Sequence, residues 1–507
     1  MTTMLISGGH VLRGDLKTCR PADVLIENGI IRAIEPPGQI TLENLERIEA
    51  SDRLLVPGLV NGHTHGHGGL GKGAVADRVP LEVFLSASGA INGSRTVEDK
   101  RLSATLTAVE LVRKGCTAAY DLFVEYPVPS REGMDAVAEA YGEVGMRAVI
   151  APMMADRTLY SALPGLMEAL PPQLQERARK IEVAPYEASV AAVREILANW
   201  HFDRDLLRPA LGPTIPLHCS DAFLLTCARL AEEYDVVVQT HVAESKTQAL
   251  LGLKKYGRSL VAHLQGLGVL GPRFSAAHGI WLSGDDIARL SDAGAGVVHN
   301  PMSNLRLGSG VAPARALLEA GVRLGIGTDA SNTSDGQNMF EAQRLAALLS
   351  RVADVDPARW LSVEEAFRAA TEGSAAILGF DRIGRLEPDY RADIVFLDIG
   401  HINYVPLRSP LRQLVLTENG AAIDSVMVDG RFVLRGGRLL TLDETRLRRQ
   451  VEAAVDRLDA ANATARETAE PFRDLIGRFC LAHARQPFES AHLTTSAVDP
   501  TGTASAS

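Results

Sequence analysis

Eight short apolar runs, each followed by a stretch with helical spacing, constrain the fold of this 507-residue chain more than any other feature. Strands that alternate with amphipathic helices indicate βα units and a parallel sheet. Eight such units predict an α/β chain folded as a closed (β/α)₈ barrel of the TIM type, in which catalytic groups come from the carboxyl ends of the strands. The expected strands are 54–60, 117–121, 147–152, 207–212, 236–240, 274–277, 296–298 and 322–327.

Both ends of the chain have a different pattern. Residues 4–56 and 392–434 contain β-branched runs, and Asn28-Gly29 and Asp429-Gly430 are two-residue hairpin signals. We expect the two ends to pair into one small β-sandwich domain, formed from 1–56 and 385–440, beside a barrel at 57–384. Residues 441–485 are charged with helical spacing, and 486–507, rich in Ser, Thr, Gly, Ala and Pro, are expected to be disordered.

Composition narrows the class of partner. Lys and Arg number 52 against 62 Asp and Glu, so the net charge of -10 attracts neither nucleic acid nor an anionic membrane, and a small-molecule partner is expected. The first residues lack a basic segment followed by an apolar one, and no window reaches the roughly 18 apolar residues of a membrane span. A cytoplasmic location is therefore the expectation.

The five cysteines are scattered and never form a CxxC pair. This spacing argues against a disulfide framework and against a thiolate metal site. Any metal must then be held by histidines and carboxylates.

Histidines and one aspartate stand at the ends of five predicted strands. His63 and His65 follow the first strand, and side chains two apart on an extended segment point the same way. An HxH pair alone is weak evidence, since surface or core histidines give it too. The later strands, however, end in turn on His241, His278, His299 and Asp329. With 13 histidines in the whole chain, chance would seldom produce this series.

These residue types predict a metal site. Neutral imidazoles with one carboxylate suit a borderline cation such as Zn²⁺, which lowers the pKa of a bound water to about 7. Glu244, three residues after His241, is suited to shuttle protons to a leaving nitrogen. His67 could be a further ligand only if the chain stayed extended through Gly66, so we expect it in the pocket lining instead.

Five segments resemble the amidohydrolase superfamily, in particular its cytosine, guanine and S-adenosylhomocysteine deaminases and its triazine hydrolases. They are 57–65 (PGLVNGHTH), 241–244 (HVAE), 277–279 (AHG), 299–310 (HNPMSNLRLGSG) and 327–331 (GTDAS). The similarity covers roughly residues 4–460. It implies a metal-dependent hydrolase of carbon–nitrogen bonds other than peptide bonds.

The resemblance also implies roles for single residues. His63, His65, His241 and Asp329 would bind one metal ion per subunit, Zn²⁺ or else Fe²⁺ or another divalent ion. Catalysis would fall to Glu244, which protonates the substrate, to His278, which orients the hydroxide or stabilises the tetrahedral intermediate, and to Asp329, which takes a proton from the attacking water. His67, His299 and Asn304 would bind substrate or support the residues that do. Members with two metals use a lysine of the fourth strand, and 207–214 contains none. Related barrels suggest a homo-oligomer, a dimer or tetramer.

Three functions stay open at this point. The first is an aminohydrolase, or deaminase, of a nitrogen heterocycle. The second is displacement of chloride, an alkylamine or an amide or urea nitrogen by the same residues. The third is a metal-binding scaffold without turnover. The Gly-rich stretch 66–73 lacks the GxxxxGK[ST] spacing of a phosphate loop, which makes nucleotide phosphate binding there a weak alternative.

Overall fold

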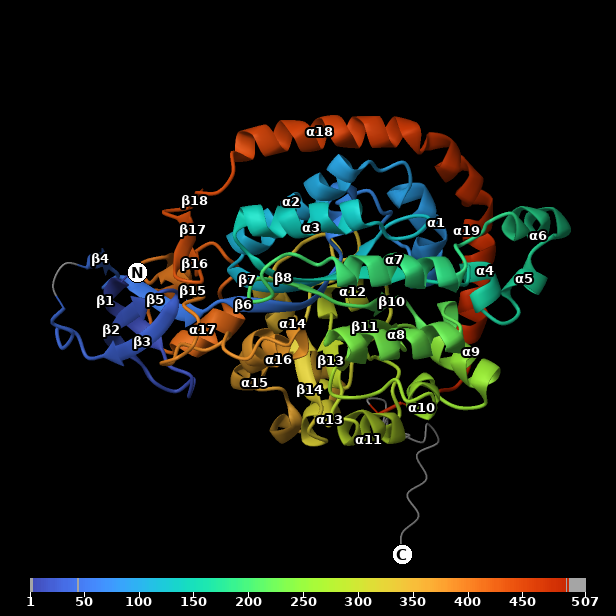
Figure 1. Ribbon diagram of the computed structural model, residues 1–507. Helices are drawn as coiled ribbons and strands as arrows, with labels where there is room; N and C mark the ends of the chain where they lie inside the picture. Colours follow the sequence, from blue (N-terminus) through green and yellow to red (C-terminus); the bar gives the residue numbers. More distant parts are fainter. Residues whose placement is uncertain (1–2, 43–44, 489, 492–507) are drawn as a thin grey trace, which may run out of the picture.

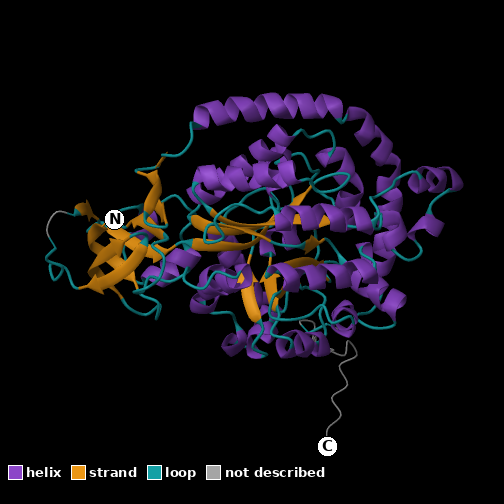
Figure 2. Ribbon diagram, in the orientation of Figure 1, coloured by secondary structure: helices purple, strands orange, loops and turns teal. Residues whose placement is uncertain are grey.

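Two parallel sheets, surrounded by helices, form the centre of the computed structural model, which describes residues 3–42, 45–488 and 490–491 (Figures 1 and 2). The first has the order β10-β8-β7-β6, with β9 paired to β8, and the second has the order β11-β12-β13-β14. The strands are β6 (Leu59–Thr64), β7 (Cys116–Val124), β8 (Arg147–Met154), β9 (Leu207–Pro209), β10 (Gly212–Pro213), β11 (Val238–Val242), β12 (Phe274–His278), β13 (Gly296–His299) and β14 (Arg323–Ile326). The predicted α/β architecture with parallel strands is confirmed.

Backbone hydrogen bonds also join the two sheets to each other. Leu211 forms a parallel bridge with Val238 on one side. On the other side, the amide of Asp329 donates to the carbonyl of His63 at 3.0 Å. These bonds bring the carboxyl ends of β6, β11, β12 and β14 to the same end of the molecule.

Two of the expected strands are divided in the structure, whereas the bounds of the others differ from those predicted by at most three residues. The run 54–60 is divided at Gly58: β5 (Arg53–Pro57) belongs to another sheet, and β6 begins at Leu59. A side chain at Gly58 would collide with Thr117, and the amide of Gly58 donates to the carbonyl of Asp393, so the chain changes sheets there. The run 207–212 is divided into β9 and β10 by Ala210 and Leu211, whose amides donate to the carbonyl of Ile150 on one side and to that of Val237 on the other.

A single nine-stranded sheet contains strands from both ends of the chain, with the order β18-β17-β16-β15-β5-β1-β2-β3 and with β4 on β1. Asn28-Gly29 and Asp429-Gly430 form its two hairpin turns, and all four residues have the positive φ that such turns require. That this sheet forms two layers stays a prediction. Its other strands are β1 (Thr3–Leu12), β2 (Cys19–Glu27), β3 (Ile30–Glu35), β4 (Glu46–Glu49), β15 (Ile394–Asp398), β16 (Ile423–Val428), β17 (Arg431–Arg435) and β18 (Arg438–Leu439).

Helices cover the outside of the parallel strands (Figure 2). The α-helices up to the last two are α1 (Leu81–Asn92), α2 (Val97–Arg113), α3 (Arg131–Val144), α4 (Leu159–Ala162), α5 (Leu166–Ala169), α6 (Pro172–Arg179), α7 (Tyr186–Ala198), α8 (Asp221–Tyr234), α9 (Lys246–Tyr256), α10 (Leu260–Gly266), α11 (Gly284–Asp292), α12 (Pro301–Arg306), α13 (Ala314–Glu319), α14 (Met339–Ala353), α15 (Val363–Arg368), α16 (Ser374–Leu378) and α17 (Pro410–Leu416). Shorter helical segments are η1 (Gly66–Gly71), η2 (Pro216–His218), η3 (Pro357–Arg359), η4 (Ala369–Gly373) and η5 (Ile402–Tyr404). No helix of the described residues is both long and apolar enough for a membrane span.

The C-terminal segment forms two long helices, α18 (Glu444–Ala461) and α19 (Ala463–Ala484). In Figure 1, α18 crosses the top of the molecule above α2, and α19 descends beside α1. The disorder predicted for 486–507 falls mainly on residues outside those described. The five cysteines are free thiols, and four of them are buried.

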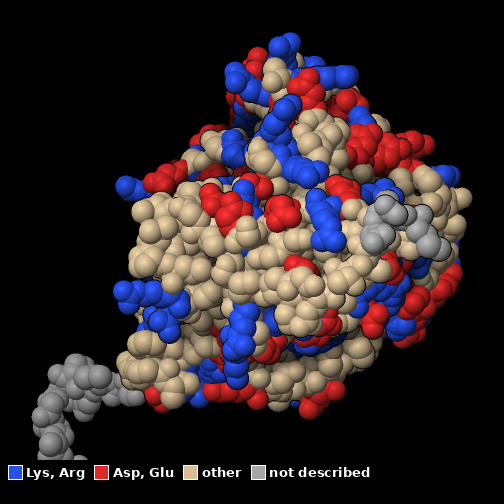
Figure 3. Space-filling model, turned by 90° about the vertical axis from the view of Figure 1, so that its left-hand side faces the viewer, with Lys and Arg blue, Asp and Glu red and all other residues tan. Residues whose placement is uncertain are grey.

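Figure 3 shows the end of the molecule that carries the nine-stranded sheet. Lys and Arg side chains lie interspersed with Asp and Glu over this face. Among the residues drawn in colour there, no broad area carries one sign alone, in keeping with the small-molecule partner expected from composition.

A buried ion pair joins the parallel strands to the outer sheet. Arg147, at the start of β8, is almost fully buried, and its Nε donates to Oδ2 of Asp393 at 2.8 Å. Its Nη2 donates to Oδ1 of Asp429 at 2.9 Å. The Asp393 carboxylate also accepts the backbone amide of Asp429 at 2.7 Å, so these hydrogen bonds fix the positions of both carboxylates.

We predict that Arg147→Ala lowers the free energy of unfolding by about 3–5 kcal/mol, because it leaves a buried carboxylate without its partner. Chemical denaturation measures the loss. As a control, Arg448→Ala removes an exposed pair with Glu452 and should cost less than about 1 kcal/mol. Equal losses in the two variants would contradict a structural role for the buried pair.

Candidate metal centre and active site

Four side chains from three strand ends meet in one buried cluster. His63 and His65 come from the end of β6, His241 from β11, and Asp329 from the residues after β14. The Nε2 atoms of His65 and His241 lie 3.1 Å apart. Oδ1 of Asp329 lies 3.3 Å from Nε2 of His65 and 3.6 Å from Nε2 of His63. The structure thus brings together the predicted ligand set.

An oxygen atom fixes the tautomer of each of these imidazoles. Nδ1 of His65 donates to the carbonyl of Leu122 at 2.6 Å, and Nδ1 of His241 donates to the carbonyl of Thr214 at 2.5 Å. Nδ1 of His63 donates to Oε1 of Gln239 at 2.7 Å, and the Gln239 amide in turn donates to the carbonyl of Gly62. Each Nε2 therefore turns an unshared electron pair toward the cluster.

This arrangement fits a bound cation. Two nitrogens without protons repel each other at 3.1 Å unless a positive charge lies between them. A tetrahedral ion with bonds of about 2.0–2.1 Å separates its nitrogen ligands by about 3.3 Å, close to the separation here. Nε2 of His63 is buried and has no hydrogen-bond partner within the described residues. Burial, followed by the neighbouring His63, lowers the pKa of His65 to about 4, so this imidazole stays neutral and able to bind metal.

The carboxylate of Asp329 supplies the negative charge of the cluster. Burial alone would raise the pKa of Asp329, but the surrounding imidazoles hold it well below its usual range. Oδ1 accepts the amide of Ala330 at 2.8 Å, and Oδ2 accepts the hydroxyl of Ser303 at 2.5 Å. These bonds fix the carboxylate and leave it ionised.

Three residues at the strand ends have a left-handed backbone. The φ angles are +50° at Ala243, +69° at His278 and +62° at Asp329. Such a conformation costs a residue with a side chain about 1–3 kcal/mol and is typical of functional sites. Here it turns the chain sharply after β11, β12 and β14.

Glu244 and His278 form a second pair beside the cluster. Oε2 of Glu244 lies 3.7 Å from Nε2 of His278, and both side chains are buried. Burial, and then the charges of Asp329 and Glu82, raise the pKa of Glu244 well above its usual range. Burial lowers the pKa of His278 to about 4. Burial thus disfavours the charged form of both side chains, which face each other in an arrangement suited to proton transfer.

His299 and Asn304 lie behind His278. Nδ1 of His278 donates to Oδ1 of Asn304 at 2.8 Å, and the amide nitrogen of Asn304 lies 3.5 Å from Nδ1 of His299. Neither residue is part of the cavity lining at the metal cluster. Their predicted contact with substrate stays a prediction, whereas their contact with His278 is direct.

His67 has left the extended course of β6, because the chain enters η1 at Gly66. Its Nδ1 accepts the amide of Val124 at 3.2 Å, so the neutral ring carries its proton on Nε2. The ring packs against Phe123 and lines the cavity. The position agrees with the pocket role expected for His67.

The Gly-rich stretch serves packing. Most of η1 is buried, and a side chain at Gly69 would lie 2.5 Å from the carbonyl oxygen of Ser103 on α2. A side chain at Gly68 would meet Ala330 and Asn332 at 2.9 Å. The glycines allow the HxH segment to lie against α2 and against the residues that follow Asp329.

Sequence reasoning missed the residues that support the cluster. Gln239 stands two residues before His241 on β11, so strand alternation alone could have identified it. Asp121, at β7, accepts the amide of Gly66 at 2.7 Å and the hydroxyl of Tyr141 at 3.0 Å, and burial raises its pKa to about 7. No sequence signal marks Ser303 as the partner of Asp329.

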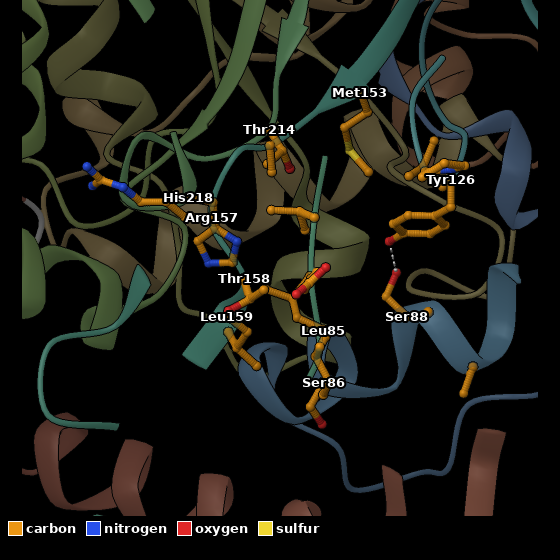
Figure 4. Close-up of a pocket in the computed structure, with 18 of the residues that line it drawn as sticks. Leu85, Ser86, Ser88, Tyr126, Met153, Arg157, Thr158, Leu159, Thr214 and His218 are labelled. Atoms are coloured by element: carbon orange, nitrogen blue, oxygen red, sulfur yellow. Dashed lines mark hydrogen bonds between the residues drawn. The ribbon is translucent and has the colours of Figure 1, made fainter. Parts of the chain in front are cut away.

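Two adjoining cavities lead to the cluster. The inner cavity, about 50 Å³, is lined by His65, His67, His241, Glu244, His278 and Asp329 together with apolar side chains. The outer cavity, about 710 Å³, shares five lining residues with it, and none of its lining residues belongs to the cluster; Figure 4 shows part of this lining. The shared residues are Leu85, Ser88, Met153, Thr214 and Ile215.

Comparison with known proteins agrees with this geometry. Residues 54–433 match the sequence profile of the Amidohydrolase family. A 5-methylthioadenosine/S-adenosylhomocysteine deaminase of Desulforudis audaxviator is 35% identical over 86% of this chain and 94% of its own length. The crystal structure of a zinc-bound adenosine deaminase from Xanthomonas campestris has a TM-score of 0.80, is 28% identical, and covers 90% of this chain and 99% of its own. A zinc complex of atrazine chlorohydrolase from Arthrobacter aurescens has a TM-score of 0.79, is 27% identical, and covers 89% of this chain and all of its own.

We predict that His65→Ala abolishes metal binding, because it removes one of four converging ligands. Elemental analysis should show one divalent ion per chain in the unaltered protein and almost none in the variant. His263→Ala is the control, since His263 is a buried histidine that pairs with Asp221 and stacks on Tyr256, outside the cluster. Full metal content in His65→Ala would contradict the ligand assignment.

Gln239→Leu should weaken metal binding about 10–100-fold, because His63 loses the acceptor that fixes its tautomer. Competition with a chelator of known affinity measures the change. Gln343→Leu alters a buried glutamine on α14 whose side-chain amide forms no hydrogen bond to an imidazole within the described residues, and it should keep the original affinity. Equal affinities in both variants would contradict the role of Gln239.

Proposed function

Because the chain belongs to the amidohydrolase family, we propose that it is a metal-dependent hydrolase that releases ammonia from an amino-substituted nitrogen heterocycle. The observation that carries the proposal is the pair of Glu244 and His278 beside the histidine cluster. A scaffold that only binds metal has no use for a buried protonated carboxyl group at the edge of its metal site.

One divalent cation would be held by His63, His65, His241 and Asp329. Zinc is the ion we propose, because three imidazoles and one carboxylate suit it and because the two similar solved structures contain zinc. A bound zinc ion lowers the pKa of a coordinated water to about 7 and so supplies a nucleophile at neutral pH.

The protein residues divide the proton transfers between them. Asp329 is ionised and accepts the proton that the water loses as its oxygen attacks the ring carbon bearing the amino group. Glu244 is protonated and donates to the ring nitrogen next to that carbon. The carbon–nitrogen bond to the amino group then breaks, and ammonia leaves with the proton that Asp329 accepted earlier. The hydroxyl on the ring carbon returns its proton to Glu244 as it becomes a carbonyl oxygen. Overall, water is consumed and ammonia is released.

His278 orients the attacking hydroxide through its Nε2, which faces Glu244. Asn304 holds the other nitrogen of this ring, and His299 supports Asn304 in turn. We therefore propose that His299 and Asn304 position His278. His67, which carries its proton on Nε2, would contact the substrate.

Among heterocycles, we propose the 6-aminopurine of a nucleoside, because the relative that is 35% identical is named for such substrates. The alternative is displacement of chloride from a triazine, as the name of the Arthrobacter aurescens enzyme suggests for that protein. The same residues could perform either reaction, so product analysis must separate them.

We also propose that the two parallel sheets close into one barrel, which the hydrogen bonds of Leu211 and Asp329 across the two seams support. The division into a barrel at 57–384 and a composite domain from both chain ends belongs to the same proposal. A dimer or tetramer and a cytoplasmic location stay predictions from the sequence.

We predict that Glu244→Gln lowers kcat about 10²–10⁴-fold, the usual contribution of general acid–base catalysis, while metal content is unchanged. The measurement is ammonia release and product mass from the metal-loaded protein with aminopurine nucleosides, aminopyrimidines, pterins and chlorotriazines. Glu232→Gln, at an exposed site on α8, should keep full activity. Chloride release without ammonia would favour the alternative, and undiminished turnover by Glu244→Gln would refute the proposed mechanism.

A further inference from the structure

The inner cavity is too small to hold a whole substrate. At about 50 Å³ it lies far below the roughly 300–1,000 Å³ of small-molecule sites, whereas the adjoining outer cavity of about 710 Å³ lies within that range. A ring that reacts at the cluster must therefore carry its remaining part into the outer cavity. We propose that the outer cavity, which α19 closes, is the subsite for a substituent of that ring, and this proposal rests on the proposed function. The substituent is uncharged and its far end is apolar.

Most of the side chains around the outer cavity are apolar. Leu85 stands at its junction with the inner cavity, and Leu159, Ile181 and Phe472 line it further away. Figure 4 shows Leu85 and Leu159 on one side, and Met153 and Thr214 on the other. Such walls stabilise an alkyl or alkylthio group by excluding it from water.

Helix α19 closes the cavity on the side away from the strands. Ala465, Thr468 and Phe472 follow at spacings that share one helical face, and all three line the cavity. The helix is held in place along its length: the Asn462 amide donates to the carbonyl of Gly93, and the Arg177 guanidinium donates to the carbonyl of Thr468 at 2.7 Å. This wall lies beyond residue 433, where the family match ends.

Three charged residues line the outer cavity, and none of them presents a buried charge that lacks a partner: Glu125 is paired, the Arg157 guanidinium points away from the other labelled side chains in Figure 4, and Glu182 is exposed. Glu125 forms an ion pair with Lys100 and accepts the hydroxyl of Ser130 at 2.7 Å. Arg157 interacts with the hydroxyl of Tyr256, a residue outside the lining. Glu182, the remaining charged residue of the lining, is exposed to water. A charged substituent would therefore lose water without gaining a buried partner.

The polar groups of the lining are neutral. The hydroxyls of Ser88 and Tyr126 lie 3.4 Å apart, as the dashed line in Figure 4 marks, and the imidazole of His218 stands near Thr214 in the same view. Burial lowers the pKa of His218 to about 4, so its ring is uncharged at neutral pH. Groups of this kind can hydrogen-bond to the hydroxyls of a sugar between the ring and its apolar end.

Three nucleosides with the same purine test the charge preference. They are 5'-deoxyadenosine, 5'-methylthioadenosine, which adds a neutral thioether, and S-adenosylhomocysteine, which adds a thioether ending in an ammonium and a carboxylate. We expect kcat/KM to be highest for the methylthio compound and at least tenfold lower for S-adenosylhomocysteine. Equal or higher kcat/KM for S-adenosylhomocysteine would overturn the proposal.

Ala465→Trp tests the wall. Ala465 is exposed on the face of α19 that lines the cavity, so a large side chain there fills the subsite without disturbing the packed core. The ratio of kcat/KM for 5'-methylthioadenosine to that for 5'-deoxyadenosine should fall at least tenfold. Ala463→Trp, at an exposed position of the same helix outside the lining, should leave the ratio unchanged. An unchanged ratio in Ala465→Trp with an unchanged unfolding midpoint would overturn the proposal.

A binding measurement separates this proposal from the proposed function. Calorimetric titration of the three nucleosides into metal-loaded Glu244→Gln protein, with and without Ala465→Trp, needs no turnover. If the unaltered protein releases no ammonia from any of them, the deaminase proposal fails. The subsite proposal still holds if the methylthio compound binds at least tenfold more tightly than S-adenosylhomocysteine and loses that advantage in Ala465→Trp. Absence of binding by the methylthio compound overturns it.

Discussion

Three hydrogen bonds to oxygen atoms determine what this site can bind. The carbonyls of Leu122 and Thr214 and the side chain of Gln239 each accept the Nδ1 proton of one histidine. Because the proton is held there, every Nε2 presents an electron pair to the same point. Loss of any of these acceptors would free a ring to turn or to change tautomer, and the ligands would no longer converge.

Two carboxyl groups close to this point acquire opposite protonation states from their surroundings. The Ala330 N–H and the Ser303 O–H stabilise the charge of Asp329, while burial and the negative charge of Asp329 favour the neutral form of Glu244. The two residues can then act as base and acid at the same pH. Both side chains end in a carboxyl group, so the difference between their roles comes from their surroundings.

The chemistry and the selection of substrate come from different parts of the chain. Strand ends of the parallel sheets supply the side chains to which we assign the reaction. The outer cavity is bounded on one side by strand ends, with Val124 of β7 and Met153 of β8 in its lining, and on the others by α1, by the segment between β8 and α7, and by α19. Changes in the two helices and in that segment can alter the space for a substituent without moving the cluster, because the strands that hold the cluster are fixed by their own hydrogen-bond ladders.

The sequence by itself determined the parallel α/β architecture, the two hairpins, and the residue types at the strand ends. Period-two spacing put His63 beside His65, and the ends of successive strands supplied His241, His278 and Asp329. These features are local, since each depends on the pattern within one strand and its turn.

Other features were decided only by the tertiary structure. The division of the first strand at Gly58 depends on Thr117 and Asp393, and the place of His299 and Asn304 behind His278 depends on how β12 and β13 pack. The left-handed turns at His278 and Asp329, and the closing of the outer cavity by α19, likewise follow from contacts between distant segments. A periodic pattern specifies which residues share a face, but the partner of that face is fixed by packing across the whole chain.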